Sequence, residues 1–181
     1  MKKALLILLL SVITLGASAQ THKFYAGGQL TFGRTTAEPS GVKSTQVTVL
    51  PEIGYNITDR FGVGTHVGVQ YRKTGDEKMT VFRLEPYARY SYLQVSIVKL
   101  FVDFGVDFGA GRADGSTAIQ YGIGFRPGVL VSLNDRFSLV AHVGFLGYQS
   151  GNNAAKRNGT PENWGLNLNS ENLMFGFSVH F

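Results

Sequence analysis

The sequence predicts an all-β fold, an eight-stranded antiparallel up-and-down transmembrane β-barrel. Apolar and polar residues alternate with a period of two along eight segments, and each is long enough for a tilted membrane strand, which needs roughly 9 to 11 residues. The chain is rich in residues typical of such strands, with 23 glycines, 8 tyrosines and 13 phenylalanines. The last segment ends on the aromatic Phe181.

The first three predicted strands are 23–34, 45–55 and 61–72, separated by a polar loop at 35–44 and a tight turn at 56–60. In the first strand, Leu30 and Phe32 share one parity and Gln29 and Thr31 the other. Successive side chains of a strand point to opposite faces, so one face is apolar. The third strand places three glycines on its polar face, as a crowded barrel interior requires.

The next two predicted strands, 79–92 and 98–111, follow the charged loop 73–78 and the turn 93–97. Arg83, Glu85 and Arg89 share one parity of the fourth strand, and Asp103 and Asp107 share one parity of the fifth. Charges confined to one face are expected where the other face contacts lipid.

Segments 118–133, 137–148 and 166–181 complete the set, with a long glycine- and asparagine-rich connection at 149–165. The last segment alternates apolar residues from Leu173 to Phe181. A soluble lipocalin-like barrel or sandwich is the alternative explanation of alternation. A soluble fold reverses the pattern, because it hides the apolar face and exposes the charged one.

The amino terminus predicts export. Lys2 and Lys3 precede an apolar run over 4–15 and the small residues Ala17-Ser18-Ala19. This is the pattern of a secretory signal peptide, so we predict a cleaved segment at 1–19 and a single barrel domain at 20–181. The formal charge of +5 then falls to +3, because two lysines leave with the signal. That charge is too small to indicate nucleic-acid binding.

The even strand number places both termini on the periplasmic side and the loops 35–44, 73–78 and 149–165 outside. Aromatic residues near strand ends are expected to form two girdles at the membrane interfaces. The inner girdle is predicted from Tyr55, Phe61, Tyr90, Tyr92, Phe137 and Phe181, and the outer girdle from Phe32, Tyr71, Phe82, Phe108, Tyr121 and Phe145.

Pro51, Pro86 and Pro127 each lie on the outward parity of a predicted strand. Proline removes a ladder donor and is normally confined to edges or bulges. We therefore expect local bulges there, and a bulge would invert the inside and outside assignment for part of its strand.

The inward parity carries a nearly balanced set of charged and histidine residues, which we predict to form a polar network in the lumen. An eight-stranded interior is just wide enough for side chains to fill it, so this network is expected to plug the barrel. The alternative is a narrow polar pathway whose charges set selectivity. The predicted network comprises Glu52, Arg83, Glu85, Arg89, Asp103, Asp107, Arg126, His66 and His142.

The sequence favours no enzyme, cofactor or metal. The chain has no cysteine, which excludes disulfides, thiolate catalysis, Cys-ligated zinc and a lipid-anchored precursor. The histidines lack a metal-ligand spacing, and no serine, histidine and carboxylate set is predicted near the outer rim. A lipid-modifying enzyme of the outer leaflet is therefore the least favoured alternative.

The predicted signal peptide, the eight alternating segments, the Pro-Glu-Ile-Gly-Tyr stretch at 51–55 and the terminal Phe181 resemble the OmpA/OmpX-like outer-membrane β-barrel family over essentially the whole mature chain. The final segment also resembles the carboxyl-terminal insertion signal of such proteins, with Gly176, Val179 and Phe181 at its key positions. Met174 departs from that pattern, which has a polar residue there.

The resemblance implies residence in the outer membrane of a Gram-negative bacterium. It implies a structural or surface-interaction role, with a narrow porin-like pore as the alternative. Expected partners are outer-membrane lipid and lipopolysaccharide, the barrel-assembly machinery during insertion, and an extracellular partner bound through the loops 35–44 and 149–165. The protein is expected to be a monomer.

Overall fold

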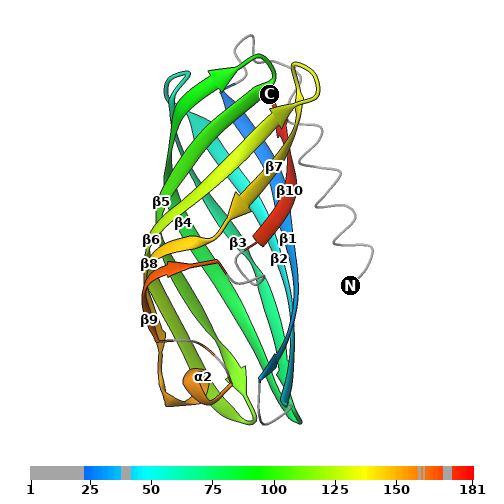
Figure 1. The fold of residues 1–181 in the computed structure, drawn as a ribbon, viewed down its shortest axis with the longest axis vertical. Helices are drawn as coiled ribbons and strands as arrows, with labels where there is room; N and C mark the ends of the chain where they lie inside the picture. Colours follow the sequence, from blue (N-terminus) through cyan, green and yellow to red (C-terminus); the bar gives the residue numbers. More distant parts are fainter. Residues whose placement is uncertain (1–22, 38–41, 159, 161, 169–172) are drawn as a thin grey trace.

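A computed structural model describes residues 23–37, 42–158, 160, 162–168 and 173–181. These residues form a closed antiparallel barrel of eight strands, drawn in Figure 1 with its long axis vertical. The predicted signal peptide at 1–19 lies outside the described residues. No helix among the described residues is long and apolar enough to cross a membrane.

The strands are tilted and follow one another around the wall (Figure 1). Their bounds are β1 Phe24–Ala37, β2 Val42–Asn56, β3 Phe61–Thr74, β4 Glu77–Val95, β5 Val98–Ala113, β6 Ser116–Ser132, β7 Phe137–Val143, β8 Phe145–Gly151, β9 Asn163–Asn167 and β10 Leu173–His180. A short helix, α2 Asn153–Arg157, lies between β8 and β9, at the end of the barrel opposite the carboxyl terminus.

Consecutive strands pair from β1 to β6. The seventh strand of the barrel is interrupted and consists of β7 and β8, which both pair with β6. The eighth strand of the barrel consists of β9, which pairs with β8, and β10, which pairs with β7 and closes the barrel against β1. The β1–β10 ladder runs from Tyr25 opposite His180 to Leu30 opposite Phe175. Among the described residues, β9 pairs with β8 alone.

The expected strands are present, but several boundaries differ. The predicted loop 35–44 is largely strand, because β1 continues to Ala37 and β2 begins at Val42. The connection 149–165 contains the end of β8, the helix α2 and the start of β9. These extensions are polar, so backbone pairing continues beyond the apolar alternation that a membrane-facing segment shows.

The two faces of the wall have the predicted character. Most apolar side chains on the outward parity are exposed, among them Val67 at 36% and Phe32 at 68%. Polar side chains on the inward parity are buried. The outward pattern is typical of a wall that faces hydrocarbon, and the closed ladder satisfies the backbone groups that hydrocarbon cannot.

The expected bulges at Pro51 and Pro86 are wrong. On either side of Pro51, β2 and β3 keep one register, with Val49 opposite Val69 and Glu52 opposite His66. The β4–β5 ladder behaves in the same way around Pro86. A missing proline N–H interrupts the ladder locally without inserting a residue, so the inward assignment of the neighbouring carboxylates is preserved.

At Pro127 the bulge is in the neighbouring strand. Arg126 and Pro127 of β6 lie opposite three residues, Val143, Gly144 and Phe145. Gly144 has a φ of +77°, a conformation that favours glycine. The extra residue inverts the parity that follows, so Phe145 is 2% exposed and faces the lumen. Its predicted place in the outer girdle is therefore wrong. A second irregularity lies in β4 between Ser91 and Leu93.

Candidate functional site

The candidate site is the polar layer that fills the middle of the barrel. Six strands supply its charged and histidine side chains: Glu52 from β2, His66 from β3, Arg83, Glu85 and Arg89 from β4, Asp103 and Asp107 from β5, Arg126 from β6 and His142 from β7. Except for Arg83, whose side chain is 17% exposed, all of them are buried.

Arg89 is the centre of the half of this layer that lies nearer the carboxyl end of β10. Its Nε donates to Asp103 Oδ1 at 2.7 Å, and its Nη2 donates to Asp103 Oδ2 at 2.8 Å and to Glu52 Oε1 at 3.0 Å. The guanidinium also stacks 4.2 Å from the Phe101 ring centroid and 4.9 Å from that of Tyr87. A planar donor fork between two carboxylates and two rings is a geometry that lysine cannot reproduce.

The two histidines connect this cluster across the lumen. His142 Nε2 lies 2.8 Å from Asp103 Oδ2, and His142 Nδ1 donates to Gln29 Oε1 at 2.9 Å. The Gln29 amide in turn donates to His66 Nε2 at 2.8 Å, and His66 Nε2 lies 3.6 Å from Glu52 Oε1. The chain of contacts therefore runs from β5 across to β2.

Arg126 is the centre of the other half, nearer α2. Its Nη2 donates to Asp107 Oδ2 at 2.7 Å, and its Nη1 lies 3.2 Å from Glu85 Oε2. Glu85 Oε1 is also 2.7 Å from Arg83 Nε, and Arg83 Nη1 donates to Gln70 Oε1 at 2.9 Å. Phe145, which the bulge turns into the lumen, lies beneath Arg126, with its ring centroid 5.3 Å from the guanidinium carbon.

Uncharged lumen residues complete the layer, and the sequence pattern did not single them out. Gln29 bridges the two histidines. The hydroxyls of Tyr25 and Tyr87 are 2.9 Å apart, and Tyr87 donates to Glu52. Gln46 accepts from Gln70 and Arg72. The sequence feature that could have identified them is their inward parity, which they share with the charged residues.

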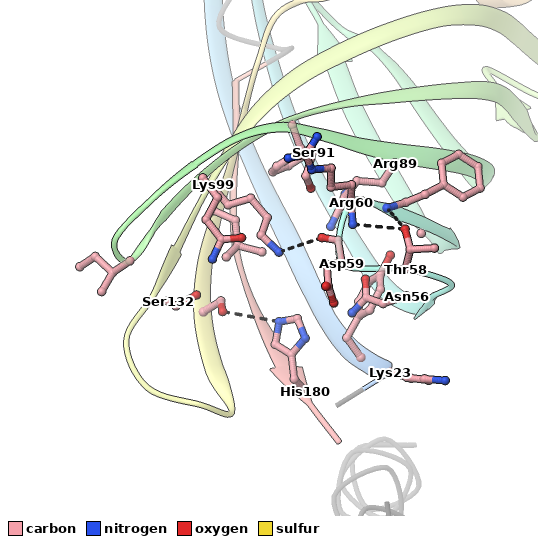
Figure 2. A pocket seen from close by; sticks show the side chains of 18 of the residues that line it. Lys23, Asn56, Thr58, Asp59, Arg60, Arg89, Ser91, Lys99, Ser132 and His180 are labelled. Atoms are coloured by element: carbon pink, nitrogen blue, oxygen red, sulfur yellow. Dashed lines mark hydrogen bonds between the residues drawn. The ribbon is translucent and has the colours of Figure 1, made fainter. Parts of the chain in front are cut away.

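Two cavities flank the polar layer. The larger one, here called the vestibule, opens at the end where β10 finishes, has a volume of about 850 Å³ and reaches inward to Tyr25, Arg89 and Phe101. Figure 2 shows it with Arg89, Lys99 and His180 among its lining residues. The smaller cavity, nearer α2, is about 60 Å³ and is lined by Gln46, Gln70, Arg83 and Asp107, among others.

Among the described residues, none lines both cavities. Glu52, His66, Glu85 and His142 line neither, so they lie in the layer that separates the two. In the part of the chain that the structure describes, no group of three or more His, Asp or Glu residues is arranged to hold a metal ion.

The model of the outer membrane protein beta-barrel domain family matches residues 5–181. The chain belongs to this family. It is therefore an outer-membrane protein of a Gram-negative bacterium, and the outward apolar wall faces the lipid of that membrane. The family comprises barrels in general and assigns neither a specific role nor an activity.

A comparison with solved structures supports this architecture through one small barrel. Neisserial surface protein A (NspA) is 17% identical, with a TM-score of 0.51, and the match covers 91% of this chain and 100% of that one. OmpT, an outer membrane protein of Vibrio cholerae solved as a trimer, is 12% identical with a TM-score of 0.36, over 90% of this chain and 53% of that one. At 17% identity the likeness to NspA concerns the fold alone. No curated protein matches the sequence.

Proposed function

We propose that the protein is a sealed, monomeric outer-membrane barrel with a structural or surface-interaction role, and that its charged network is a plug. One observation carries this proposal: among the described residues the vestibule and the smaller cavity share no lining residue, and buried ion pairs occupy the layer between them.

The contacts of that layer favour a fixed plug over a gate. Arg89 holds two carboxylates and Arg126 holds two more. Opening a path would leave buried charges without their partners, which costs several kcal/mol. At the level of this layer the side chains fill the interior of the barrel, as is typical of eight strands, so the separated charges would gain no compensating space for water.

The extracellular end supports a role in surface interaction. Asn152 caps α2, with its side chain accepting from Ala155 N at 3.1 Å, and also bonds β6 through Ile119 N and Thr117 O. Lys156 donates to Glu162, which raises the pKa of the Lys156 amine. Trp164, two residues after Glu162, is 80% exposed. The described residues among 149–165 thus form a shaped surface on a rigid scaffold, where binding residues are often found.

The carboxyl-terminal strand supports assembly through the barrel-assembly machinery, with Gly176, Val179 and Phe181 as the proposed insertion signal. Gly176 packs against β1 so closely that a Cβ there would lie 2.2 Å from Gly28 O. The Phe181 amide donates to Phe24 O at 2.8 Å. We propose that the mature domain begins at residue 20.

A narrow pore is the second candidate, and the large polar vestibule favours it. Conductance of the refolded protein in a planar bilayer separates the two. For a plug we expect a silent wild type, a silent Lys99→Ala control, which changes the vestibule alone, and leakage from Arg89→Ala and Glu85→Ala. A steady wild-type conductance whose ion preference shifts in Arg89→Ala would establish the pore instead.

We propose no enzymatic activity, since the polar side chains of the layer are held by one another. Refolding into phospholipid vesicles tests this directly. Release of fatty acid or transfer of an acyl chain by the wild type, above the level of empty vesicles, would contradict it.

A further inference from the structure

Five basic side chains form a band on the outer surface of the barrel, near its extracellular rim. Arg34, Lys43, Lys73, Lys78 and Arg112 come from the adjacent strands β1 to β5 and are all exposed. Each has the outward parity of its strand, alternating with buried neighbours such as Arg72, Met79 and Ala113. We call this set the basic row.

The ladders place these residues side by side. Arg34 lies opposite Thr45, Thr45 opposite Lys73, and Lys73 opposite Lys78. Lys43 is two residues from Thr45 along β2, and Arg112 lies opposite Thr80, two residues from Lys78. Directly opposed side chains are about 5 Å apart at Cβ and diagonal ones about 7 to 8 Å. The row is therefore continuous across five strands.

The positive charges of the basic row are not neutralised by ion pairs. Among the described residues, none of the five side chains forms an ion pair. The nearby carboxylates Asp76, Glu77 and Asp114 lie at the ends of turns, and Asp114 accepts from the backbone N of Lys78. Like charges directly opposite one another in a sheet are destabilising, and Lys73 opposite Lys78 is such a pair.

The depth of the row identifies its environment. Along β3 the outward face is mainly apolar from Phe61 to Tyr71, and ten steps of ~3.4 Å tilted by ~40° span about 26 Å. That matches the ~25 Å apolar band of an outer-membrane barrel. Lys73 follows directly above Tyr71, and Arg34 directly above Phe32, so the row lies at the level of the lipid headgroups.

We propose that the basic row binds the phosphate groups of an anionic glycolipid of the outer leaflet. Guanidinium and ammonium groups form charge-assisted hydrogen bonds with phosphate oxygens. A phosphate between Lys73 and Lys78 also removes their repulsion. The aromatic and apolar residues just below would contact the acyl chains. This site does not depend on whether the lumen is sealed.

Native mass spectrometry of the detergent-refolded protein tests the proposal, with diphosphoryl lipid A as the probe and its dephosphorylated form as the reference. We expect the wild type to retain the phosphorylated probe at least tenfold better than the reference. We expect Lys73→Gln/Lys78→Gln to lose most of this preference, and 0.5 M salt to weaken it.

The control is Arg60→Gln/Arg136→Gln, which removes the same charge at the periplasmic turns and should behave as wild type. In micelles without lipid, Lys73→Gln/Lys78→Gln should melt no lower than wild type, because a repulsive pair is lost; with lipid A it should melt lower. If that variant fails to fold, Arg34→Gln/Arg112→Gln replaces it. Equal retention of the two lipids, or equal loss in test and control variants, would overturn the proposal.

Discussion

Individual lumen residues carry the most concentrated interactions of this barrel, and Arg89 is the clearest case. Its guanidinium is the shared partner of Glu52 and Asp103, and three rings surround it. Since these carboxylates lie on different strands, one side chain couples β2, β4 and β5. In the other half of the plug, Arg126 of β6 is likewise the shared partner of Glu85 of β4 and Asp107 of β5.

At this scale we predict that Arg89→Met lowers the free energy of unfolding by about 3 to 5 kcal/mol, because two buried carboxylates lose their counterion. Adding Glu52→Gln and Asp103→Asn should recover part of that loss, since no uncompensated charge remains. Urea titration of the refolded protein in lipid vesicles measures both. A triple variant no more stable than Arg89→Met would show that the charges are not the cause.

Among the elements, the seventh strand of the barrel, made of β7 and β8, departs most from regular geometry. Its break at Gly144 lets β7 and β8 pair with the same strand β6 in two registers, and it turns Phe145 inward beneath Arg126. The bulge thus converts a lipid-facing aromatic residue into part of the plug. Bulges in barrels commonly reorient a side chain in this way.

We predict that Gly144→Ala costs about 1 to 2 kcal/mol, because its φ of +77° is strained for an L-residue. Its Cβ would also lie 2.6 Å from Leu168 Cδ2, which must move. The control is Gly28→Ala, whose nearest neighbour would be 3.5 Å away and which should change stability by no more than about 0.5 kcal/mol. The fluorescence of Trp164, the single tryptophan, reports unfolding. Equal costs would contradict the role of the bulge.

The whole molecule has two chemically different ends. The end at which β10 finishes holds the open vestibule. The opposite end carries α2 (Figure 1) and the basic row. In between, the apolar band fixes the depth at which the barrel sits in lipid. The even strand number predicts that the end where β1 begins and β10 finishes is periplasmic.

We predict that Asn153→Cys is labelled by a membrane-impermeant maleimide on intact cells, because α2 faces outside. Asp135→Cys, in the turn between β6 and β7, should be labelled only after the outer membrane is permeabilised. The chain has no native cysteine, so the wild type supplies the background. The reverse pattern would invert the proposed orientation.

Much of this barrel follows from the sequence by itself. A period of two assigns each side chain to one face, so the alternation alone places Glu52, His66, Asp103 and His142 in the lumen. The proline positions are equally visible in the sequence, but their effect is not. Whether a missing N–H is accompanied by a bulge depends on the backbone conformations that residues of the facing strand can adopt. This is a property of the paired strands and not of one strand alone.

The sequence determined the fold class, the membrane-facing pattern and the charged content of the interior, because all three depend on the alternation of residues along single strands. Only the tertiary structure decided the partners: Arg89 with Glu52 and Asp103, Gln29 between the histidines, and Phe145 inside. The physical reason is register, since a ladder sets which side chains meet across the lumen and one extra residue at Gly144 inverts all that follow in its strand.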